Sequence, residues 1–322
     1  MVDVAQRAGV SLKTVSRVVN GSPQVQPELA DRVRAAIAEL GFRRNQLASA
    51  LRSGQTTATI GLLIEEIANP FYATIADAVA EVSRSHDTLL ITASSEEDPA
   101  REEEVLRDLC ARRVDGLVIV PAGFDHSFLR DEVERGLPVV FLDRPVGGLV
   151  ADTVLLDNRG GTRSGVERLL TQGHRRIAVL FDEVAYTMRE RLEGAREAFA
   201  GVGERLDDAL VCADVSDPRS AAERVARLAE LAEPPTAYVC LNNRITVGAL
   251  QELWRRGGDA ELLGFDDFEL SYLMPRPFTV IAYDLRQLAA RAAELLFARI
   301  AGDTSWPRTE VLPTYLVERG LR

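Results

Sequence analysis

From about residue 58 onward the chain alternates short apolar runs with amphipathic helical stretches, and this alternation restricts the fold more than any other feature of the sequence. Apolar strands that alternate with helices are typical of parallel sheets covered by helices on both faces. The runs that we predict as strands are 60–64, 88–92, 116–120, 139–142, 177–181, 237–241, 262–265 and 280–283. Because ligands of such sheets bind outside the carboxyl ends of the strands, we expect a binding site there.

The first 44 residues predict a different fold, a small cluster of three helices. Asp3, with Gln6 three residues later, is typical of a capped helix start, and Gly9 ends that helix. Ser11 caps a second helix, and the two helices together predict a helix-turn-helix. A third helix is predicted over 27–41, and the side chains expected to cover the first two helices are Leu29, Val33, Ile37 and Leu40.

The predicted second helix has a polar outer face that carries Lys13 and Arg17. Lysine and arginine donate hydrogen bonds to phosphates and to guanine in the major groove of DNA. Residues 1–54 contain eight basic and four acidic side chains, whereas the rest of the chain has a net charge of −15. A basic segment on an acidic body is typical of a nucleic-acid-binding protein, but a solvated basic surface explains the charge alone equally well.

Length and composition restrict the class of protein. At 322 residues the chain is long enough for two or three hydrophobic cores. Hydrophobic residues make up 46% and charged residues 27%, which is typical of a soluble globular protein, and no apolar stretch reaches the roughly 18 residues of a membrane span. The first residues lack the basic start and apolar stretch of a secretory signal, so we expect a cytoplasmic protein.

The sequence lacks the common motifs of catalysis and cofactor binding. No glycine-rich phosphate loop follows the first strand, and neither a nucleophile elbow nor a zinc-protease motif is present. The three cysteines are far apart, and His86, His126 and His174 are scattered, which favours buried thiols and helix-end or turn histidines over metal ligands. We expect no enzymatic activity, no cofactor and no metal. An α/β enzyme, or a small-molecule-binding protein without a DNA function, is the alternative class.

The run from residue 4 to residue 21 resembles, nearly position for position, the signature of the LacI family of bacterial repressors. The stretch 241–244 departs from the family's pattern, in which Asn-Asp is usual, and this bears on the identity of the ligand. The resemblance continues at the end of the third helix, in the hinge and in turns of the core, at residues 36–45, 45–54, 69–72, 142–145, 157–158, 173–178 and 264–267.

This resemblance implies an all-α helix-turn-helix headpiece in residues 1–44, a hinge helix and linker in 45–57, and an α/β core like a periplasmic binding protein in 58–322. We expect two Rossmann-like lobes in the core, the first formed by about 58–157 and 284–322 and the second by about 158–283. The implied function is that of a dimeric transcriptional repressor that binds a pseudo-palindromic operator in double-stranded DNA and responds to a small molecule.

The resemblance also implies which residues contact DNA. The second helix lies in the major groove, and Leu51 of the hinge matches a leucine that wedges into the minor groove. A linker leucine without such a role is the alternative for Leu51. The residues expected at the DNA are Ser11, Leu12, Lys13, Thr14, Ser16, Arg17, Asn20, Ala48, Leu51 and Arg52.

The effector is expected between the two lobes. Carboxylate, carboxamide and guanidinium groups beside two aromatic rings suit a hydroxyl-rich ring, so a sugar is the first choice. The aromatic rings could equally stack on a base, which makes a purine the second choice, or they could serve only in packing. The residues expected at the effector are Phe71, Tyr72, Thr187, Arg191, Asn242, Asp266 and Tyr283.

Overall fold

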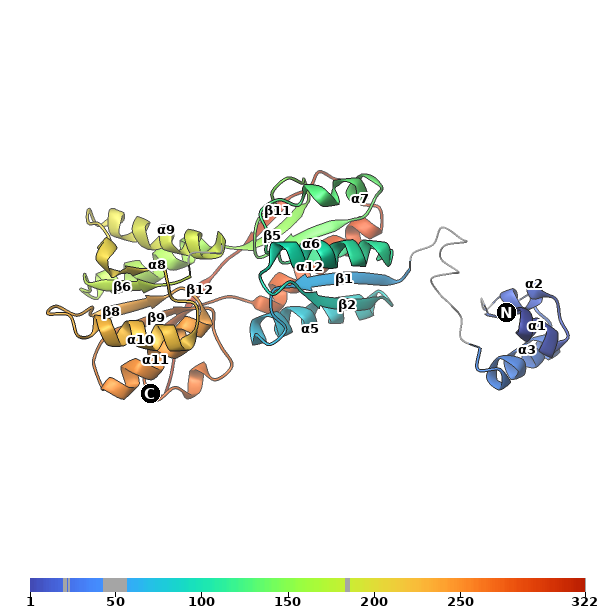
Figure 1. Ribbon diagram of the computed structural model, residues 1–322, viewed down its shortest axis with the longest axis horizontal. Helices are drawn as coiled ribbons and strands as arrows, with labels where there is room; N and C mark the ends of the chain where they lie inside the picture. Colours follow the sequence, from blue (N-terminus) through green and yellow to red (C-terminus); the bar gives the residue numbers. More distant parts are fainter. Residues whose placement is uncertain (20–21, 23, 43–56, 183–185, 322) are drawn as a thin grey trace. The chain divides into compact units, whose positions relative to one another are not determined.

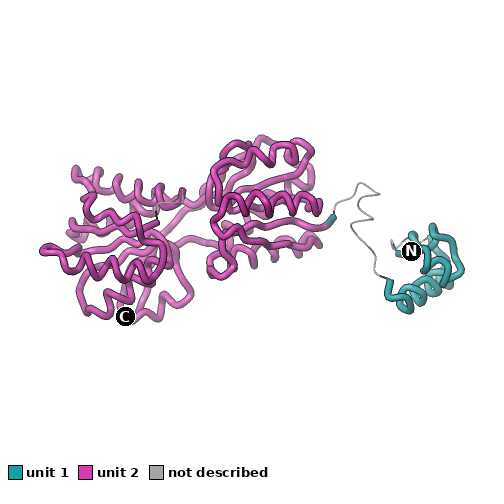
Figure 2. Tube along the Cα trace, viewed as in Figure 1, with its two compact units in different colours: residues 1–57 teal, residues 58–322 magenta. Residues whose placement is uncertain are grey.

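The computed structural model describes residues 1–19, 22, 24–42, 57–182 and 186–321. The chain divides between Thr57 and Ala58 into two compact units (Figure 2). Unit 1 contains the helical headpiece and unit 2 contains the α/β core. In the described part of the chain, no helix combines the length and the apolar character that crossing a membrane requires.

The described part of unit 1 contains three helices, α1 (Val2–Ala8), α2 (Leu12–Val19) and α3 (Pro27–Glu39). Gly9 ends α1 in the left-handed conformation, with a φ of 62°, which glycine adopts at little cost. The hydroxyl oxygen of Ser11 accepts the Thr14 N–H at 3.1 Å and so caps α2. One small core holds the helices together, and its most buried side chains are Val4, Val15 and Val33.

Two details of the predicted headpiece are wrong. Helix α1 begins at Val2 with Met1 at its N-cap, so Asp3 lies in the first turn, where a carboxylate still stabilises the helix through its dipole. Helix α3 ends at Glu39, and Leu40 is 46% exposed. The face of α3 that meets the core is formed by Val33 and small alanines, so the core is filled before the helix reaches Leu40.

The first lobe of unit 2 has a six-stranded parallel sheet in the order β11-β5-β4-β3-β1-β2 (Figure 1). The strands are β1 (Thr59–Ile64), β2 (Leu89–Ser94), β3 (Leu117–Ile119), β4 (Val139–Leu142), β5 (Asp152–Leu156) and β11 (Thr309–Leu312). Helices α5 (Pro70–Ser85) and α12 (Leu285–Ile300) cover one face, and α6 (Pro99–Ala111) and the short α7 (Arg130–Glu134) cover the other.

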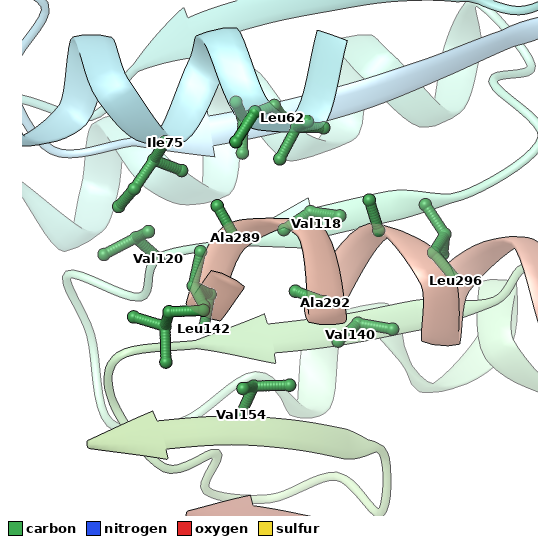
Figure 3. Close-up of a cluster of buried hydrophobic side chains, with 14 of the residues drawn as sticks. Leu62, Ile75, Val118, Val120, Val140, Leu142, Val154, Ala289, Ala292 and Leu296 are labelled. Carbon is green, nitrogen blue, oxygen red and sulfur yellow. The ribbon is translucent and has the colours of Figure 1, made fainter. Parts of the chain in front are cut away.

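The packing of α12 shows why this sheet reads as a series of apolar runs. Ala289, Ala292 and Leu296 of this helix lie beside Val118 and Val140 of the central strands, and all five side chains are buried (Figure 3). Strands that are buried on both faces must be apolar at every position, which removes the period-two pattern of a half-exposed strand.

The second lobe has a six-stranded sheet in the order β12-β10-β9-β8-β6-β7, in which only β12 is antiparallel to its neighbour. Its strands are β6 (Ile177–Leu180), β7 (Val211–Cys212), β8 (Ala237–Cys240), β9 (Glu261–Phe265), β10 (Phe278–Ala282) and β12 (Tyr315–Arg319). Helices α8 (Asn158–Thr171) and α9 (Tyr186–Gly201) cover one face, and α10 (Pro218–Leu228) and α11 (Asn243–Arg256) cover the other.

The expected lobe boundary is wrong at the end of the chain. We expected all of 284–322 in the first lobe, but β12 pairs with β10, so the last strand belongs to the second lobe. The chain therefore passes between the lobes three times, at 156–158, 282–285 and 312–315. The misassigned segment is an edge strand with partly exposed side chains, which gives no apolar run to read.

Candidate functional site

Residues from both lobes of unit 2 line one cavity of about 120 Å³. The first lobe contributes the carboxyl ends of β1 and β4 and the first turn of α5, and the second lobe contributes α9 and residues that follow β8 and β9. This is the position in which parallel sheets bind their ligands. Six of the seven residues expected at the effector line the cavity, namely Phe71, Tyr72, Thr187, Arg191, Asn242 and Asp266.

Arg191 on α9 is only 3% exposed, and four hydrogen bonds hold it in place. Its Nε donates to Asn158 Oδ1 at 2.7 Å, and Nη1 donates to the backbone carbonyl of Leu241 at 2.5 Å. The two Nη atoms also donate to the carboxylate of Asp266, at 3.0 and 3.2 Å, in the bidentate arrangement that makes such pairs strong. The guanidinium group lies over the ring of Phe265, 3.6 Å from its centre. Arg191 is therefore a rigid part of the cavity wall.

Tyr283, the seventh residue expected at the effector, does not line the cavity. Its hydroxyl donates a hydrogen bond to Asp266 Oδ1 at 2.7 Å. Burial and the neighbouring Asp266 carboxylate raise the pKa of Tyr283 well above its ordinary value, so the phenol keeps its proton and remains a donor. Tyr283 orients Asp266, and its place after β10 did not reveal which group its hydroxyl meets.

Two aspartates occupy corresponding places in the two lobes. Asp143 follows β4 and Asp266 follows β9, and both line the cavity. Both have left-handed backbones, with φ of 69° and 67°. Aspartate tolerates this conformation better than most residues, but it still costs roughly 1–3 kcal/mol, and such strain is often found at ligand sites.

Glu65, Tyr72 and Arg144 form a second polar group on the first-lobe side of the cavity. Tyr72 donates its hydroxyl to Glu65 Oε2, and Arg144 donates Nη2 to the same oxygen and Nη1 to the carbonyl of Pro121. Burial raises the pKa of Glu65 to about 7, against the opposing effect of Arg144 and with a smaller contribution from Glu97. Sequence reasoning missed Glu65 and Arg144.

The two aromatic residues of the turn after β1 differ in exposure. Asn69 accepts the Phe71 N–H at 3.1 Å and Pro70 is the first residue of α5, so both rings lie in the first turn of this helix. Phe71 and Tyr72 meet edge to face, with ring centres 4.9 Å apart. Tyr72 is 4% exposed and packs into the first-lobe core, so only Phe71 offers much of its ring to a ligand.

Contacts between the lobes flank the cavity. Arg244, at the start of α11, donates Nη1 to Glu66 Oε2 at 3.1 Å. The guanidinium group of Arg189 on α9 lies 5.1 Å from the ring centre of Phe124 in the first lobe. Both pairs join side chains of different lobes, so a change in the angle between the lobes must break or rearrange them.

Asn242 lines the cavity and is also the N-cap residue of helix α11. Its side-chain oxygen accepts the Ile245 N–H at 2.8 Å and thereby caps α11. A ligand in the cavity would therefore meet the amide nitrogen of Asn242, which is a hydrogen-bond donor.

The exposed face of α2 is the candidate DNA surface in unit 1. Leu12 is 51% exposed, Lys13 and Arg17 are exposed, and Val15 on the opposite face is fully buried. Ser11, Thr14 and Ser16 complete the described part of the expected DNA set, with Ser11 exposed and the other two partly exposed. The remaining expected DNA contacts, Asn20, Ala48, Leu51 and Arg52, lie outside the described residues.

The three histidines lie at helix ends and turns, as expected. His86 is the C-cap of α5 and stacks on Phe297, and His174 follows the end of α8. His126 stands before a short 3₁₀ helix and is fully buried, with Nε2 3.0 Å from Glu102 Oε1. Over the described ranges, no cluster of three or more potential ligands is suited to a metal ion.

Comparison with known proteins gives the family. A model described as bacterial regulatory proteins, lacI family, matches residues 1–45, and one described as a periplasmic binding protein-like domain matches residues 166–320. The ribose operon repressor of Haemophilus influenzae is 30% identical over 100% of this chain and 98% of its own length. The chain belongs to the LacI family. The regulator GalR of Escherichia coli is 31% identical over 98% of this chain and 94% of its own length.

Solved structures of LacI-family proteins have the same fold. The lac repressor dimer bound to operator and the anti-inducer ONPF matches 98% of this chain and 97% of its own, with a TM-score of 0.85 and 26% identity. The complex of the regulator CelR with cellobiose matches 99% of this chain and 98% of its own, with a TM-score of 0.73 and 30% identity. The predicted family, the fold class and the general function of a DNA-binding transcriptional regulator are confirmed.

For this LacI-family chain, one rule could have located the missed cavity residues. Ligands of parallel sheets bind beyond the carboxyl ends of the strands, and Asn242 and Asp266 follow β8 and β9 in this way. Glu65 follows β1 and Asp143 follows β4 in the same way, and Arg144 is the next residue. The sequence thus contained the signal for these three residues, although it gave no indication of the ion pair between Glu65 and Arg144, which lie 79 positions apart.

Proposed function

We propose that this chain is a repressor whose affinity for operator DNA is controlled by a small, hydroxyl-rich molecule, a sugar, bound in the cavity between the lobes. The observation that carries the proposal is that Arg191 and Asp266 of the second lobe line the same cavity as Asp143 and Arg144 of the first. A ligand held from both sides stabilises one angle between the lobes, and this couples its binding to the parts of the chain that depend on that angle.

The chemistry of the cavity favours a sugar over a purine. Carboxylates accept hydrogen bonds and guanidinium groups donate them. A hydroxyl group both donates and accepts, so it can bind to either kind of side chain. A purine would require flat surfaces on which to stack, but Tyr72 is buried in the core and Phe71 meets it edge to face. Among its LacI-family relatives are a ribose operon repressor and a regulator solved with cellobiose, which also supports a sugar.

We infer that the operator is contacted by α2 and the hinge, as the family resemblance implies. Lys13 and Arg17 supply donors for phosphates and base edges, and Leu12 supplies an apolar side chain at the start of the same exposed face. The functional unit is a homodimer on a pseudo-palindromic site, a proposal supported by the structural match to the lac repressor dimer on its operator.

The experiment that tests the effector proposal is a thermal-shift screen of the full chain. Aldoses, ketoses, disaccharides and polyols form one arm, and adenine, guanine and hypoxanthine form the other. A ligand that binds only the folded state adds to the free energy of unfolding with the logarithm of its concentration, by about 2.7 kcal/mol at one hundred times the Kd, and so raises the unfolding temperature. We expect a sugar to give this shift and the purines to give none. Stabilisation by a purine alone would replace the sugar with the second candidate.

A further inference from the structure

Carboxylates outnumber guanidinium groups around the interlobe cavity. Among the described residues that line it, the carboxylates are Glu65, Glu97, Asp143, Asp182 and Asp266, and the guanidinium groups are Arg144, Arg191 and Arg244. A ligand in this cavity is therefore surrounded by more negative than positive groups. The balance matters because the cavity is small, about 120 Å³, so that a bound molecule lies close to all of its walls.

Each of the three arginines already has a carboxylate partner. Arg191 pairs with Asp266 through both Nη atoms, and its Nε and Nη1 also bond to Asn158 and the carbonyl of Leu241. A phosphate or carboxylate on the ligand would have to compete with Asp266 for this guanidinium group. The competition is unfavourable because Asp266 would be left buried without its partner.

The other two arginines are engaged in the same way. Arg144 pairs with Glu65, and its side chain is only 12% exposed. Arg244 pairs with Glu66 across the lobes at 3.1 Å. No guanidinium group in the described cavity wall is thus set aside for an anion, in contrast to sites that bind phosphate through arginines without an internal partner.

Two buried polar atoms that belong to residues of the cavity wall have no hydrogen-bond partner in the described structure. Asp143 Oδ1 is an acceptor and Arg144 Nε is a donor, and neither makes a hydrogen bond in the described structure. Asp143 itself is 5% exposed. A buried polar atom without a partner costs about 1–3 kcal/mol, so a ligand is favoured if a small shift of the wall on binding gives either atom a partner. A hydroxyl group can serve both atoms because it donates and accepts.

The pKa values of two wall carboxyl groups show that burial makes a negative charge costly in this cavity. Burial raises the pKa of Asp143 above its ordinary value, with Arg144 and Arg191 opposing and Asp266 and Glu65 adding to the rise. Burial is also the largest cause of the raised pKa of Glu65. A further negative charge placed by a ligand would meet the same desolvation and the same repulsion.

We infer that the effector is a sugar without a phosphate or carboxylate group, neutral or carrying an amino group, and that Glu65 is the residue that sets this preference. The inference rests on the proposed function, because it concerns the same cavity. Glu65 is singled out because it follows β1 in the first lobe, its side chain is 15% exposed, and it accepts from both Tyr72 and Arg144. Replacing it with glutamine removes its charge and keeps an oxygen that can accept both bonds.

The test compares matched probes by calorimetry near pH 8, at which Glu65 is ionised. The probes are D-glucose, D-galactose, D-ribose and D-fructose, a phosphate ester of each, D-glucosamine, D-galactosamine and inorganic phosphate. We expect the phosphate ester of a binding sugar to bind at least about tenfold more weakly than the parent sugar. Inorganic phosphate should stabilise the protein no more than potassium chloride at the same ionic strength.

In the variant Glu65→Gln, the ratio of the Kd of the phosphate ester to the Kd of its parent sugar should decrease by about threefold or more. Glu310→Gln is the matched control, because Glu310 also pairs with an arginine of the first lobe, Arg291, but does not line the cavity. The control variant should have the same ratio of ester Kd to sugar Kd as the parent protein. Asp143→Asn provides a second cavity variant with the same expected direction, should Glu65→Gln fold poorly.

The outcomes separate the inference from the function on which it rests. An ester that binds the parent protein as tightly as its sugar, or binding of inorganic phosphate in the cavity, overturns the exclusion of anions while a sugar-class effector stands. An unchanged ratio in both cavity variants overturns the assignment to Glu65 and its neighbour Asp143. If neither the sugars nor the esters bind, the sugar effector itself is rejected and this inference with it.

Discussion

Glu65 illustrates how a single residue in the cavity is controlled by its surroundings. Its carboxylate is desolvated, paired with Arg144 and approached by Glu97, and the net effect is a pKa of about 7 in place of 4.5. Between these two pH values the folded protein holds a proton that the unfolded chain has released. The free energy of unfolding therefore decreases as the pH rises through this window, and the loss is complete above the folded pKa.

The variant Glu65→Gln cannot titrate at this position, so it should lack this decrease in the free energy of unfolding. Relative to the parent protein, the variant should become more stable as the pH rises from about 5 to about 8, by at most about 3 kcal/mol at 1.4 kcal/mol per pKa unit. The measurement is urea unfolding of both proteins at several pH values.

Glu310→Gln is again the control for this measurement. The pairing with Arg291 lowers the pKa of Glu310, so its contribution to stability is lost only as the pH falls below the ordinary range of a glutamate. The difference between this variant and the parent should be flat between about pH 5 and pH 8. Parallel pH profiles for the parent protein and Glu65→Gln would show that Glu65 has an ordinary pKa.

Helix α11 connects the cavity to an exposed apolar surface. Its first turn carries Arg244 at the cavity, while Trp254 near its end is 65% exposed. Trp254 lines a groove of about 250 Å³ together with Leu250 of the same helix and Met274 and Phe278. An exposed tryptophan beside an apolar groove is typical of a protein interface. We predict that the proposed homodimer forms through this groove.

The variant Trp254→Glu tests this assignment. A charge placed in an apolar interface must be desolvated on association, so the dimer should weaken by about 3 kcal/mol or more, which is at least a hundredfold in its dissociation constant. Sedimentation velocity over a range of concentrations measures the shift to monomer. Tyr272→Glu is the control, because Tyr272 is 57% exposed on the same lobe but does not line the groove. Equal dissociation constants for the parent and Trp254→Glu would move the interface elsewhere.

Most predicted strands are more buried than the missed ones, with two exceptions: β2 was predicted although it is a partly exposed edge strand, and β5 was missed although it is largely buried. All eight predicted strands correspond to strands of the structure, and each was an apolar run in a sheet covered on both faces. The strands that were missed are β5, β7, β11 and β12. Three of these are edge strands, and β5 begins with Asp152 and Thr153, so the apolar runs that they offered are short. Edge strands depend on a neighbour that sequence patterns do not identify.

For the cavity, local sequence patterns identified several of the residues but not the bonds between residues that are distant in the sequence. Arg191, Asn242 and Asp266 were found because local position after a strand, or a match to the family, identified them. The bonds between these groups were not predicted, because those from Arg191 to Asn158 and Asp266 span 33 and 75 positions. The bond from Tyr283 to Asp266, 17 positions apart, was not predicted for the same reason. Only the fold brings these groups together.

Among the described residues of the core unit, the lobes are joined around the cavity by three chain passages and by side-chain contacts that include two pairs. The passages are at 156–158, 282–285 and 312–315, and the two pairs are Arg244 with Glu66 and Arg189 with Phe124. Short parallel connections of this kind permit a change of angle with few broken bonds. A ligand that touches both lobes therefore favours the conformation with one interlobe angle. The size of the shift is set by the ratio of the ligand's affinities for the two conformations.

The central claim is that sugar binding in this cavity controls operator binding. The most direct measurement is a fluorescence anisotropy titration of a pseudo-palindromic duplex, selected from random DNA by the full chain, with and without the sugar found in the screen. The parent protein should change its operator Kd at least about tenfold when the sugar is added. Asp266→Asn should bind the duplex equally well without sugar but lose the response, and Arg17→Ala should bind it about 1–3 kcal/mol more weakly. A parent protein that selects no duplex, or whose operator Kd is the same with saturating sugar, would contradict the account.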